Sequence, residues 1–405
     1  MQRYDTYKDS GVKWLGEIPT HWEVLALKHI LKSKKVIVGK YSSQYELLSL
    51  TLKGVVKRDM DNPEGKFPAS FDTYQAVEPN DFIFCNFDNE ETPRAVGLSP
   101  YKGMITGAYD VLSRKNPKLT DKYLIYYFLY IDDAKRFKPL YKGLRKTVPF
   151  DSFMSYKIPV PSIKEQDAIV NYLDTVTAKI DAAIAQQQKM IDLLNERKQI
   201  IINRAVTRGL NPNARMKDSG VEWIGEVPEH WEVRRLKSMM SIQRGHDLTA
   251  ENFKEGEIPV YGSGGLMGYH NKKTSKAPSI VIGRSGSVGK LHYIEEDFWA
   301  HNTAIYLTDN KGNHVKYLYY LLSSIELSSL ATQTAVPTLD RKNVLDYCVP
   351  VSLDFSEQSE IVRYLDKHLP TIDVAISNKN KQISLLQERK QIIINEVVTG
   401  KVKVV

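Results

Sequence analysis

The feature that most constrains this chain is a repeat, because two segments recur almost unchanged further along the sequence. Tyr7–Lys28 matches Met216–Lys237 at 15 of 22 positions, with an offset of 209 residues. Glu165–Thr207 matches Glu357–Thr399 at 25 of 43 positions, with an offset of 192 residues. Such self-similarity indicates a duplicated architecture with a pseudo-two-fold relation. We interpret the chain as two halves, each made of a first frame segment, an insert and a second frame segment.

The inserts between the frame segments differ from each other. The first covers His29–Lys157 and the second covers Ser238–Pro350, and over most of their length they look unlike each other. A short echo survives near their ends, at Val148–Pro149 and Val336–Pro337. Because the frame is kept while the insert changes, we expect the frame to have a mechanical role and each insert to recognise something different.

The second frame segment has the pattern of a coiled-coil helix. Apolar residues recur at alternating intervals of four and three, which is the spacing of a heptad seam. The expected seam residues are Ile180, Ile184, Ile191, Leu194 and Ile201 in the first copy, and Ile372, Ile376, Ile383, Leu386, Ile393 and Val397 in the second. A helix packed only on its own domain is the alternative interpretation. The polar seam positions coincide between the copies, which favours packing of the two long helices on each other. A two-fold relation between the halves would make this packing antiparallel.

A proline suggests that these helices are interrupted. Pro370 lies in the second copy, at the position of Ala178 in the first. Proline is tolerated mainly at the start of a helix. We therefore expect a short helix, a break near residues 176–178 and 368–370, and then a long helix.

The first frame segment contains Gly-Glu-x-Pro-x-His-Trp-Glu-Val in both copies. This pattern predicts a turn that carries Trp22 and Trp231 into a core. His21 and His230 raise the possibility of a metal or catalytic site. Each is a lone histidine without a second ligand at a fixed local spacing, so we favour a structural role.

The inserts are expected to be mixed α/β. Short apolar runs at Asp81–Asn86 and Ser279–Ile282 predict strands, and Trp299–Leu307 alternates toward its end. Tyr123–Tyr130 and Lys316–Leu322 predict short aromatic helices.

Composition excludes several classes of protein. The 405 residues are 42% hydrophobic and 26% charged, as in ordinary globular domains. Two cysteines, Cys85 and Cys348, exclude a disulfide framework and a cysteine-based zinc site. The polar residues Met1–Ser10 argue against a signal peptide, and no run of 18 apolar residues predicts a membrane helix. The expected location is the cytoplasm.

One glycine-rich segment resembles a phosphate loop without being one. Gly283–Lys290 reads GRSGSVGK, but Arg284 stands where a Walker A glycine is needed, and Leu291 follows the lysine. A plain hairpin turn and a loop that approaches a DNA backbone both fit the segment. No methyltransferase or nuclease signature is found, so catalysis by this chain is not expected.

The basic charge is uneven. The net charge of +8 permits a polyanionic partner. The first insert has 21 basic and 15 acidic residues, whereas the second has 11 of each. Arginine, lysine and small polar side chains on loops are the types that contact phosphates and base edges. The DNA-binding candidates are Lys53, Lys57, Arg58, Arg94, Lys102, Lys142, Arg145, Lys146, Arg244, Arg284, Ser285, Ser287, Lys290, Gln333, Thr334 and Arg341.

The chain resembles the specificity (S) subunits of type I restriction–modification systems over essentially its whole length. The resemblance rests on the doubled KDSGVxWxGExPxHWEV motif, the doubled ERKQIIIN helix and the Ile158–Gln166 segment that leaves the first insert. It implies an α+β fold with two mixed α/β target recognition domains separated by two long antiparallel helices. The corresponding domains are 1–157 and 211–350, with helical spacers at 158–210 and 351–405.

The resemblance also implies the function and the partners. A specificity subunit is not an enzyme, and each recognition domain recognises one half of a bipartite, asymmetric target in double-stranded DNA. It assembles with two methyltransferase (M) subunits and, in the full complex, with two restriction (R) subunits. S-adenosylmethionine, ATP and Mg²⁺ belong to those partners, and no membrane is involved. A scaffold of tandem domains that does not bind DNA, and a fused methyltransferase, are the rival classes.

Overall fold

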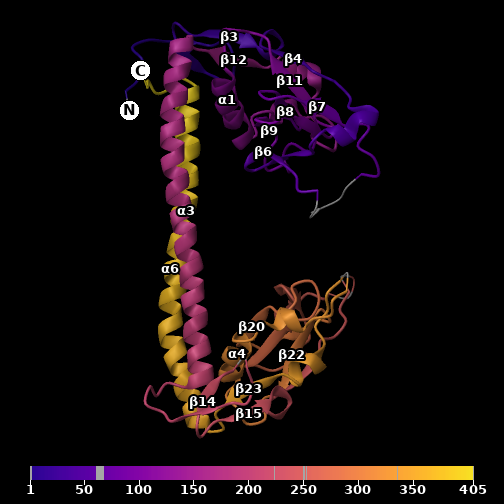
Figure 1. Ribbon diagram of the computed structural model, residues 1–405, viewed down its shortest axis with the longest axis vertical. Helices are drawn as coiled ribbons and strands as arrows, with labels where there is room; N and C mark the ends of the chain where they lie inside the picture. Colours follow the sequence, from indigo (N-terminus) through magenta and orange to yellow (C-terminus); the bar gives the residue numbers. More distant parts are fainter. Residues whose placement is uncertain are drawn as a thin grey trace. The chain divides into compact units, whose positions relative to one another are not determined.

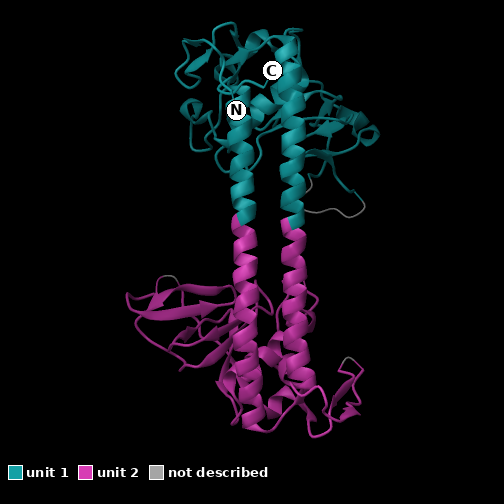
Figure 2. Cartoon of the chain, turned by 90° about the vertical axis from the view of Figure 1, so that its left-hand side faces the viewer, with its two compact units in different colours: residues 1–186, 382–405 teal, residues 187–381 magenta. Residues whose placement is uncertain are grey.

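The computed structural model describes residues 2–60, 68–222, 224–249, 251, 253–334 and 336–404. Trp223, the counterpart of Trp14 in the repeat, lies outside these residues. The chain forms two compact units, shown in Figure 2. Unit 1 contains residues 1–186 and 382–405, and unit 2 contains residues 187–381. Unit 1 is therefore discontinuous in sequence, whereas unit 2 is a single stretch.

Unit 1 is built on a four-stranded sheet in the order β4-β11-β8-β9, to which helix α1 is packed (Figure 1). Phe82 and Phe84 of the sheet contact Phe128 of α1 edge to face, with ring centroids 5.5 and 5.0 Å apart. The strands are β1 (Tyr7–Asp9), β2 (Glu17–Pro19), β3 (Glu23–Ala26), β4 (Leu31–Ser33), β5 (Leu48–Thr51), β6 (Gly54–Lys57), β7 (Gln75–Val77), β8 (Phe82–Phe84), β9 (Val96–Leu98), β10 (Gly103–Ile105), β11 (Asp110–Arg114) and β12 (Lys157–Val160). The helices of the insert and its borders are η1 (Leu27–His29), η2 (Gly39–Gln44), α1 (Asp121–Asp133), η3 (Lys138–Leu140) and α2 (Phe150–Met154).

Unit 2 repeats this plan with the sheet order β16-β22-β19-β20 and helix α4 in the place of α1. The strands are β13 (Met216–Asp218), β14 (Glu226–Pro228), β15 (Glu232–Arg235), β16 (Ser241–Arg244), β17 (Ile258–Gly262), β18 (Gly265–His270), β19 (Ser279–Gly283), β20 (Leu291–Ile294), β21 (Trp299–Ala300), β22 (Ala304–Asp309) and β23 (Cys348–Val351). The helices are η4 (Leu236–Ser238), α4 (Val315–Ser323), η6 (Leu327–Leu330) and α5 (Arg341–Leu345). The strands and helices predicted in both inserts are confirmed.

The two inserts share one fold although their sequences look unlike each other. In unit 1 the Val148 N–H donates to the Asn86 carbonyl over 2.7 Å, and in unit 2 the Leu339 N–H donates to the Arg284 carbonyl over 2.8 Å. Asn86 and Arg284 thus occupy equivalent positions after β8 and β19. Val148 then corresponds to Leu339 and not to Val336, so the Val-Pro match between the inserts is not a structural equivalence. The sheet needs only apolar residues at the right period, so very different sequences satisfy it.

The long helices are continuous. Helix α3 spans Ile163–Arg208 and helix α6 spans Phe355–Val398. The breaks predicted near residues 176–178 and 368–370 are wrong, because Pro370 lies inside α6.

Packing on both sides of the proline explains why α6 continues. A proline inside a helix costs about 3 kcal/mol, since it removes one backbone hydrogen bond and its ring crowds the preceding turn. Leu365, Leu369 and Ile372 flank Pro370 and are all buried. Burial contributes about 1.5–3 kcal/mol for each side chain of this size, which offsets the cost of the proline.

Within each unit the two helices run antiparallel, as expected from the sequence. In unit 1 the α3 end at Glu165 lies beside Trp22, which also contacts Gly400 just after α6. Further along α3, the Asp181 carboxylate pairs with the Lys390 ammonium over 2.7 Å, so α6 runs in the opposite direction. In unit 2 the equivalent ion pair joins Lys198 to Asp373 over 2.6 Å.

The predicted seam residues face inward. Ile180, Ile184, Leu386, Ile393 and Val397 belong to, or pack against, the core of unit 1. In unit 2, Ile191 and Ile372 are buried and Ile201 packs against the core. The remaining seam positions, Leu194, Ile376 and Ile383, are half-buried.

The repeated Glu-Gln pair ties each long helix to its insert. Glu165 accepts hydrogen bonds from the Trp22 indole over 3.2 Å and from the Ser162 hydroxyl over 2.7 Å. Burial alone would raise the pKa of Glu165, but the hydrogen bonds from His21, Ser162 and Trp22 hold the pKa below its ordinary value. Gln166 accepts the N–H of Thr120, the residue that caps α1.

Unit 2 contains the same contacts at equivalent positions. Glu357 accepts hydrogen bonds from the Trp231 indole over 2.9 Å and lies 3.1 Å from the His230 ring. Gln358 accepts the N–H of His314, which caps α4. These contacts support the structural role expected for both frame histidines.

The C-terminal tail of unit 1 lies against the first frame segment. Gly400 adopts a left-handed φ of +74°, and a Cβ there would lie 2.9 Å from the Trp22 ring. The Tyr7 hydroxyl donates to the Gly400 carbonyl over 3.0 Å, and the backbones of Gln2 and Lys403 form an isolated antiparallel β-bridge. In unit 2 the equivalent place beside Trp231 is held by Gly209.

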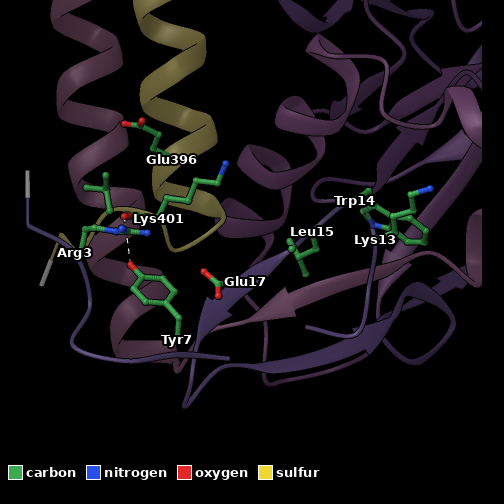
Figure 3. Close-up of a pocket in the computed structure, with 10 residues that line it drawn as sticks. Arg3, Tyr7, Lys13, Trp14, Leu15, Glu17, Glu396 and Lys401 are labelled. Atoms are coloured by element: carbon green, nitrogen blue, oxygen red, sulfur yellow. Dashed lines mark hydrogen bonds between the residues drawn. The ribbon is translucent and has the colours of Figure 1, made fainter. Parts of the chain in front are cut away.

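The meeting of tail and frame leaves a hollow of about 670 Å³ in unit 1 (Figure 3). Arg3, Lys13 and Lys401 line it together with Glu17 and Glu396. Three basic and two acidic side chains thus share its lining.

Candidate nucleic-acid interface

Three arginines from separate parts of unit 2 line a hollow of about 610 Å³. Arg244 ends β16, Arg284 directly follows β19, and Arg341 begins α5. All three were among the DNA-binding candidates, and the fold brings them together.

The sheet topology explains this convergence. Strands β16 and β19 both pair antiparallel with β22, so they run parallel to each other and end at the same sheet edge. Arg244 and Arg284 therefore lie at the same end of the sheet. The hydrogen bond from the Leu339 N–H to the Arg284 carbonyl then brings the start of α5, with Arg341, to the same edge.

The hollow has more positive charge than its carboxylates neutralise. Asp247 lies 3.5 Å from Arg244 and also accepts the side-chain amide of Asn302. Asp340 accepts the N–H of Lys342 and so caps α5. Within the described part of the chain, no carboxylate oxygen lies within 4.0 Å of the Arg284 or Arg341 guanidinium. Among the described residues, these two guanidinium groups thus have no anionic partner.

The glycine-rich segment after β19 is the turn of a hairpin. Strands β19 and β20 pair antiparallel on either side of residues 284–290. The Lys290 ammonium donates to the Gly264 carbonyl over 3.0 Å, and Ser285 bridges to Thr338. Ser287 is exposed on the same turn.

A second loop stands beside the hollow. Its ends are joined by the Thr332 N–H, which donates to the Thr338 carbonyl over 2.9 Å. Gln333 and Thr334 are exposed, as is Val336. Thr332 and Thr338 line the hollow itself. The loop therefore presents polar side chains next to a basic surface.

The basic cluster of unit 1 is largely neutralised. The Arg145 guanidinium donates to Asp88 over 2.6 Å and holds the pKa of that carboxyl below its ordinary value. Lys146 pairs with Glu91 over 2.9 Å and also with Glu90. Lys142 is exposed. Sequence reasoning missed the acidic segment from Asp88 to Glu91, since only the fold places it opposite the basic loop.

The other unit 1 candidates are mostly in ion pairs. Arg94 pairs with Asp133 over 3.2 Å, and its side chain is only 18% exposed, which favours a structural role. Lys57 pairs with Glu46 over 2.5 Å and Lys102 with Glu78 over 3.4 Å. Lys53 is exposed in the β5–β6 turn, and Arg58 is half-buried after β6.

The described residues contain no group of three or more histidine, cysteine or acidic side chains that could hold a metal ion. Among the helices of that same part, none is long and apolar enough to cross a membrane.

Two inserts with one fold and different exposed side chains are what a protein with two recognition surfaces requires. The family described as Type I restriction modification DNA specificity domain matches residues 96–191 and 228–385, together more than half of the chain. The chain therefore belongs to this family and is a type I DNA specificity subunit.

Relatives and a solved structure agree with this assignment. The chain is 27% identical to the type I restriction enzyme MjaVIII specificity subunit of Methanocaldococcus jannaschii, over 98% of this chain and 97% of that protein. It is 25% identical to the putative MjaX specificity subunit of the same organism, over 98% of each. A chain from a structural study of complex assembly and conformational transition of the type I R-M system has the same fold, with a TM-score of 0.67 at 13% identity. That similarity covers 94% of this chain and 98% of the other.

Proposed function

We propose that unit 1 and unit 2 each recognise one half of a bipartite, asymmetric DNA target, and that the chain acts without catalytic activity of its own. The observation that carries the proposal is the duplicated fold with two different polar surfaces. The frame contacts of Trp22 and Trp231 are equivalent, whereas the three-arginine hollow of unit 2 has no arginine counterpart in unit 1. A scaffold that does not bind DNA would give no reason for this divergence.

The recognition domains in this proposal are residues 1–157 and 211–350, joined to the helical spacers at 158–210 and 351–405. The M and R subunits would supply methylation and cleavage, and S-adenosylmethionine, ATP and Mg²⁺ would bind to them. The complex, with two copies of each, would act in the cytoplasm.

Exposed apolar residues on the long helices support docking of a methyltransferase subunit on each unit. Leu193 and Ile200 on α3 are 48% and 57% exposed, and their counterparts Leu385 and Ile392 on α6 are 55% and 47% exposed. They occur in the most closely repeated segment, outside the seam. Unit 2 contains the first pair and unit 1 the second, so each unit offers one equivalent surface.

Methylation mapping tests the recognition function. The chain is co-expressed with an M subunit in a host without related systems, and methylated bases are located across the genome. We expect one asymmetric sequence with two specified halves and a fixed gap. Methylation without sequence preference, or none beyond that of the M subunit alone, would contradict the proposal.

Matched variants test the docking surface. Leu193→Asp and Leu385→Asp should each reduce the amount of M subunit that co-purifies with the chain, since a charge on an apolar contact is costly to bury. Asn195→Asp, which places the same charge at another exposed position of α3, is the control for α3. Equal retention of the M subunit by all three variants would place its docking site elsewhere.

A further inference from the structure

We infer that the hollow lined by Arg244, Arg284 and Arg341 is a binding site for a phosphate group of the DNA backbone. The inference rests on the DNA-binding function proposed above and assigns one part of it to one site. In this assignment the hollow anchors the duplex to unit 2 and does not distinguish bases.

The charge of the hollow calls for an anion. Arg284 and Arg341 have no carboxylate within reach in the described part of the chain, while the nearby carboxylates of Asp247 and Asp340 already accept other donors. By contrast, the Arg145 guanidinium of unit 1 already donates to the Asp88 carboxylate through its Nε and one Nη. A guanidinium presents five N–H donors, and phosphate oxygens accept them in pairs.

The site is held in place before any ligand binds. The Arg284 N–H donates to the Thr303 carbonyl over 2.9 Å, and its own carbonyl accepts the Leu339 N–H over 2.8 Å. The side chain therefore starts from a backbone fixed on both sides. Thr332 and Thr338 also line the hollow, and their hydroxyls are used inside the loop, where Thr338 donates to the Val336 carbonyl and Thr332 contacts Thr334.

The shape of the site favours a phosphate over a base edge. Base edges lie inside the grooves and are reached by side chains that project from a protein surface. Phosphates form the outer ridges of the duplex, and a concave basic surface fits a ridge. The neighbouring loop exposes Gln333 and Thr334 and is better suited to contact base edges. Positioning by phosphates and specificity by base contacts are commonly separated in this way.

Binding of the full chain to DNA at several salt concentrations tests the inference. Arg284→Ala and Arg341→Ala should each lower the slope of log affinity against log salt by about 0.9, the value for one lost phosphate contact. Each variant should weaken binding to the target and to an unrelated duplex by the same factor. Lys217→Ala is the matched control, because Lys217 is exposed in β13, outside the insert, and has no ion pair within the described part of the chain. Its slope should stay as in the wild type.

Selection from a random duplex pool separates the possible outcomes. Wild type and Arg284→Ala should enrich the same sequence. If Arg284→Ala no longer prefers one base at a position that wild type specifies, Arg284 recognises that base, and the inference is overturned. An unchanged salt slope in both arginine variants would overturn it as well. If wild type enriches no sequence, the proposed function fails, while lowered slopes would still support a phosphate site.

Inorganic phosphate distinguishes the backbone from a free anion. The phosphate concentrations are kept low enough to leave DNA binding intact. At these concentrations, phosphate should not stabilise wild type against melting more than it stabilises Arg284→Ala. A selective rise in the wild type, together with equal DNA binding by both proteins, would assign the hollow to a free phosphate instead. Melting without ligand checks that both proteins are folded.

Discussion

Unit 1 and unit 2 are most alike where their helices meet the first frame segment and least alike where their sheets end. Trp22 and Trp231 each donate to a glutamate at the start of a long helix. Where the strands end, equivalent positions hold different residue types. By strand register and the shared loop contact, Lys35, Asn86 and Phe150 of unit 1 correspond to the three arginines of the hollow.

This difference separates two kinds of constraint. A buried tryptophan whose N–H needs a buried acceptor can hardly change without a loss of stability. A side chain at the end of a strand is restricted only by what it binds. Asn86 shows the freedom this gives, because its amide donates to Asp110 over 2.7 Å and is used inside unit 1. One fold can therefore hold two unrelated recognition surfaces.

The strongest test of the equivalence is a fragment of residues 1–215. It contains Asp181 and Lys198 but lacks α6, so its seam residues would face water. The ion pairs Asp181–Lys390 and Lys198–Asp373 are related by the repeat, so two fragments can form two Asp181–Lys198 pairs in an antiparallel dimer. We expect a homodimer in analytical ultracentrifugation.

With the M subunit present, this dimer should direct methylation to an interrupted palindrome built from the half-site of unit 1. Asp181→Lys should weaken the dimer, and Asp181→Lys with Lys198→Asp should restore it. A monomeric fragment would refute the equivalence of the two helices.

The next largest effect is expected from the frame tryptophans. Trp22→Ala and Trp231→Ala remove fully buried side chains. Each should lower the free energy of unfolding of its unit by about 3–5 kcal/mol, the usual cost of such a truncation. Trp14→Ala is the control, since Trp14 is 39% exposed. Thermal denaturation measures all three, and a Trp22→Ala melting temperature no lower than that of Trp14→Ala would contradict the role given to the frame.

A smaller effect should distinguish the basic surfaces of the two units. Replacing Lys142, Arg145 and Lys146 together by alanine removes three charges, but two of them are paired with Asp88, Glu90 and Glu91. At about 0.9 per phosphate contact, the salt slope should fall by no more than one contact. Replacing the three arginines of the hollow should lower it more. The opposite order in salt titrations would show that the ion pairs of unit 1 open on DNA.

The smallest effect expected is on the pH dependence of stability. The pKa of Glu165 is lowered in the folded state, so its contribution is present above the ordinary pKa of a glutamate and is lost as the pH falls through the folded-state value. Glu165→Gln should therefore melt at a lower temperature than wild type at neutral pH. The difference in melting temperature between the two proteins should shrink under acidic conditions. Melting curves from neutral to acidic pH measure it. A difference that stays constant with pH would show that the charge of the Glu165 carboxylate does not matter.

Much of this structure could be predicted from local patterns. The seam spacing identified the helices, and apolar runs such as Asp81–Asn86 identified strands of both sheets. The break at Pro370 was mispredicted, because a local preference was weighed without the burial of Leu369 and Ile372 on either side. Local rules do not include the tertiary packing that overrides them.

The recognition surfaces needed information that a single sequence does not contain. Arg244, Arg284 and Arg341 are far apart in the chain and meet only because β16 and β19 flank the same strand. For the same reason, the ion pair between Arg145 and Asp88 could not be predicted from the sequence. The residue types were identified, but which of them act together depends on the sheet order.

The return of the C-terminal tail to Trp22 also sets an order for protein synthesis. Unit 2 is complete in sequence at Lys381, whereas unit 1 takes its remaining helix turns and the Gly400 contact from residues 382–405. On the ribosome, the segments of unit 1 that emerge first must wait, with the apolar face around Trp22 uncovered, until unit 2 has been translated. A chain that stops early would keep that face exposed to chaperones and proteases, so only chains translated through Gly400 acquire two finished units.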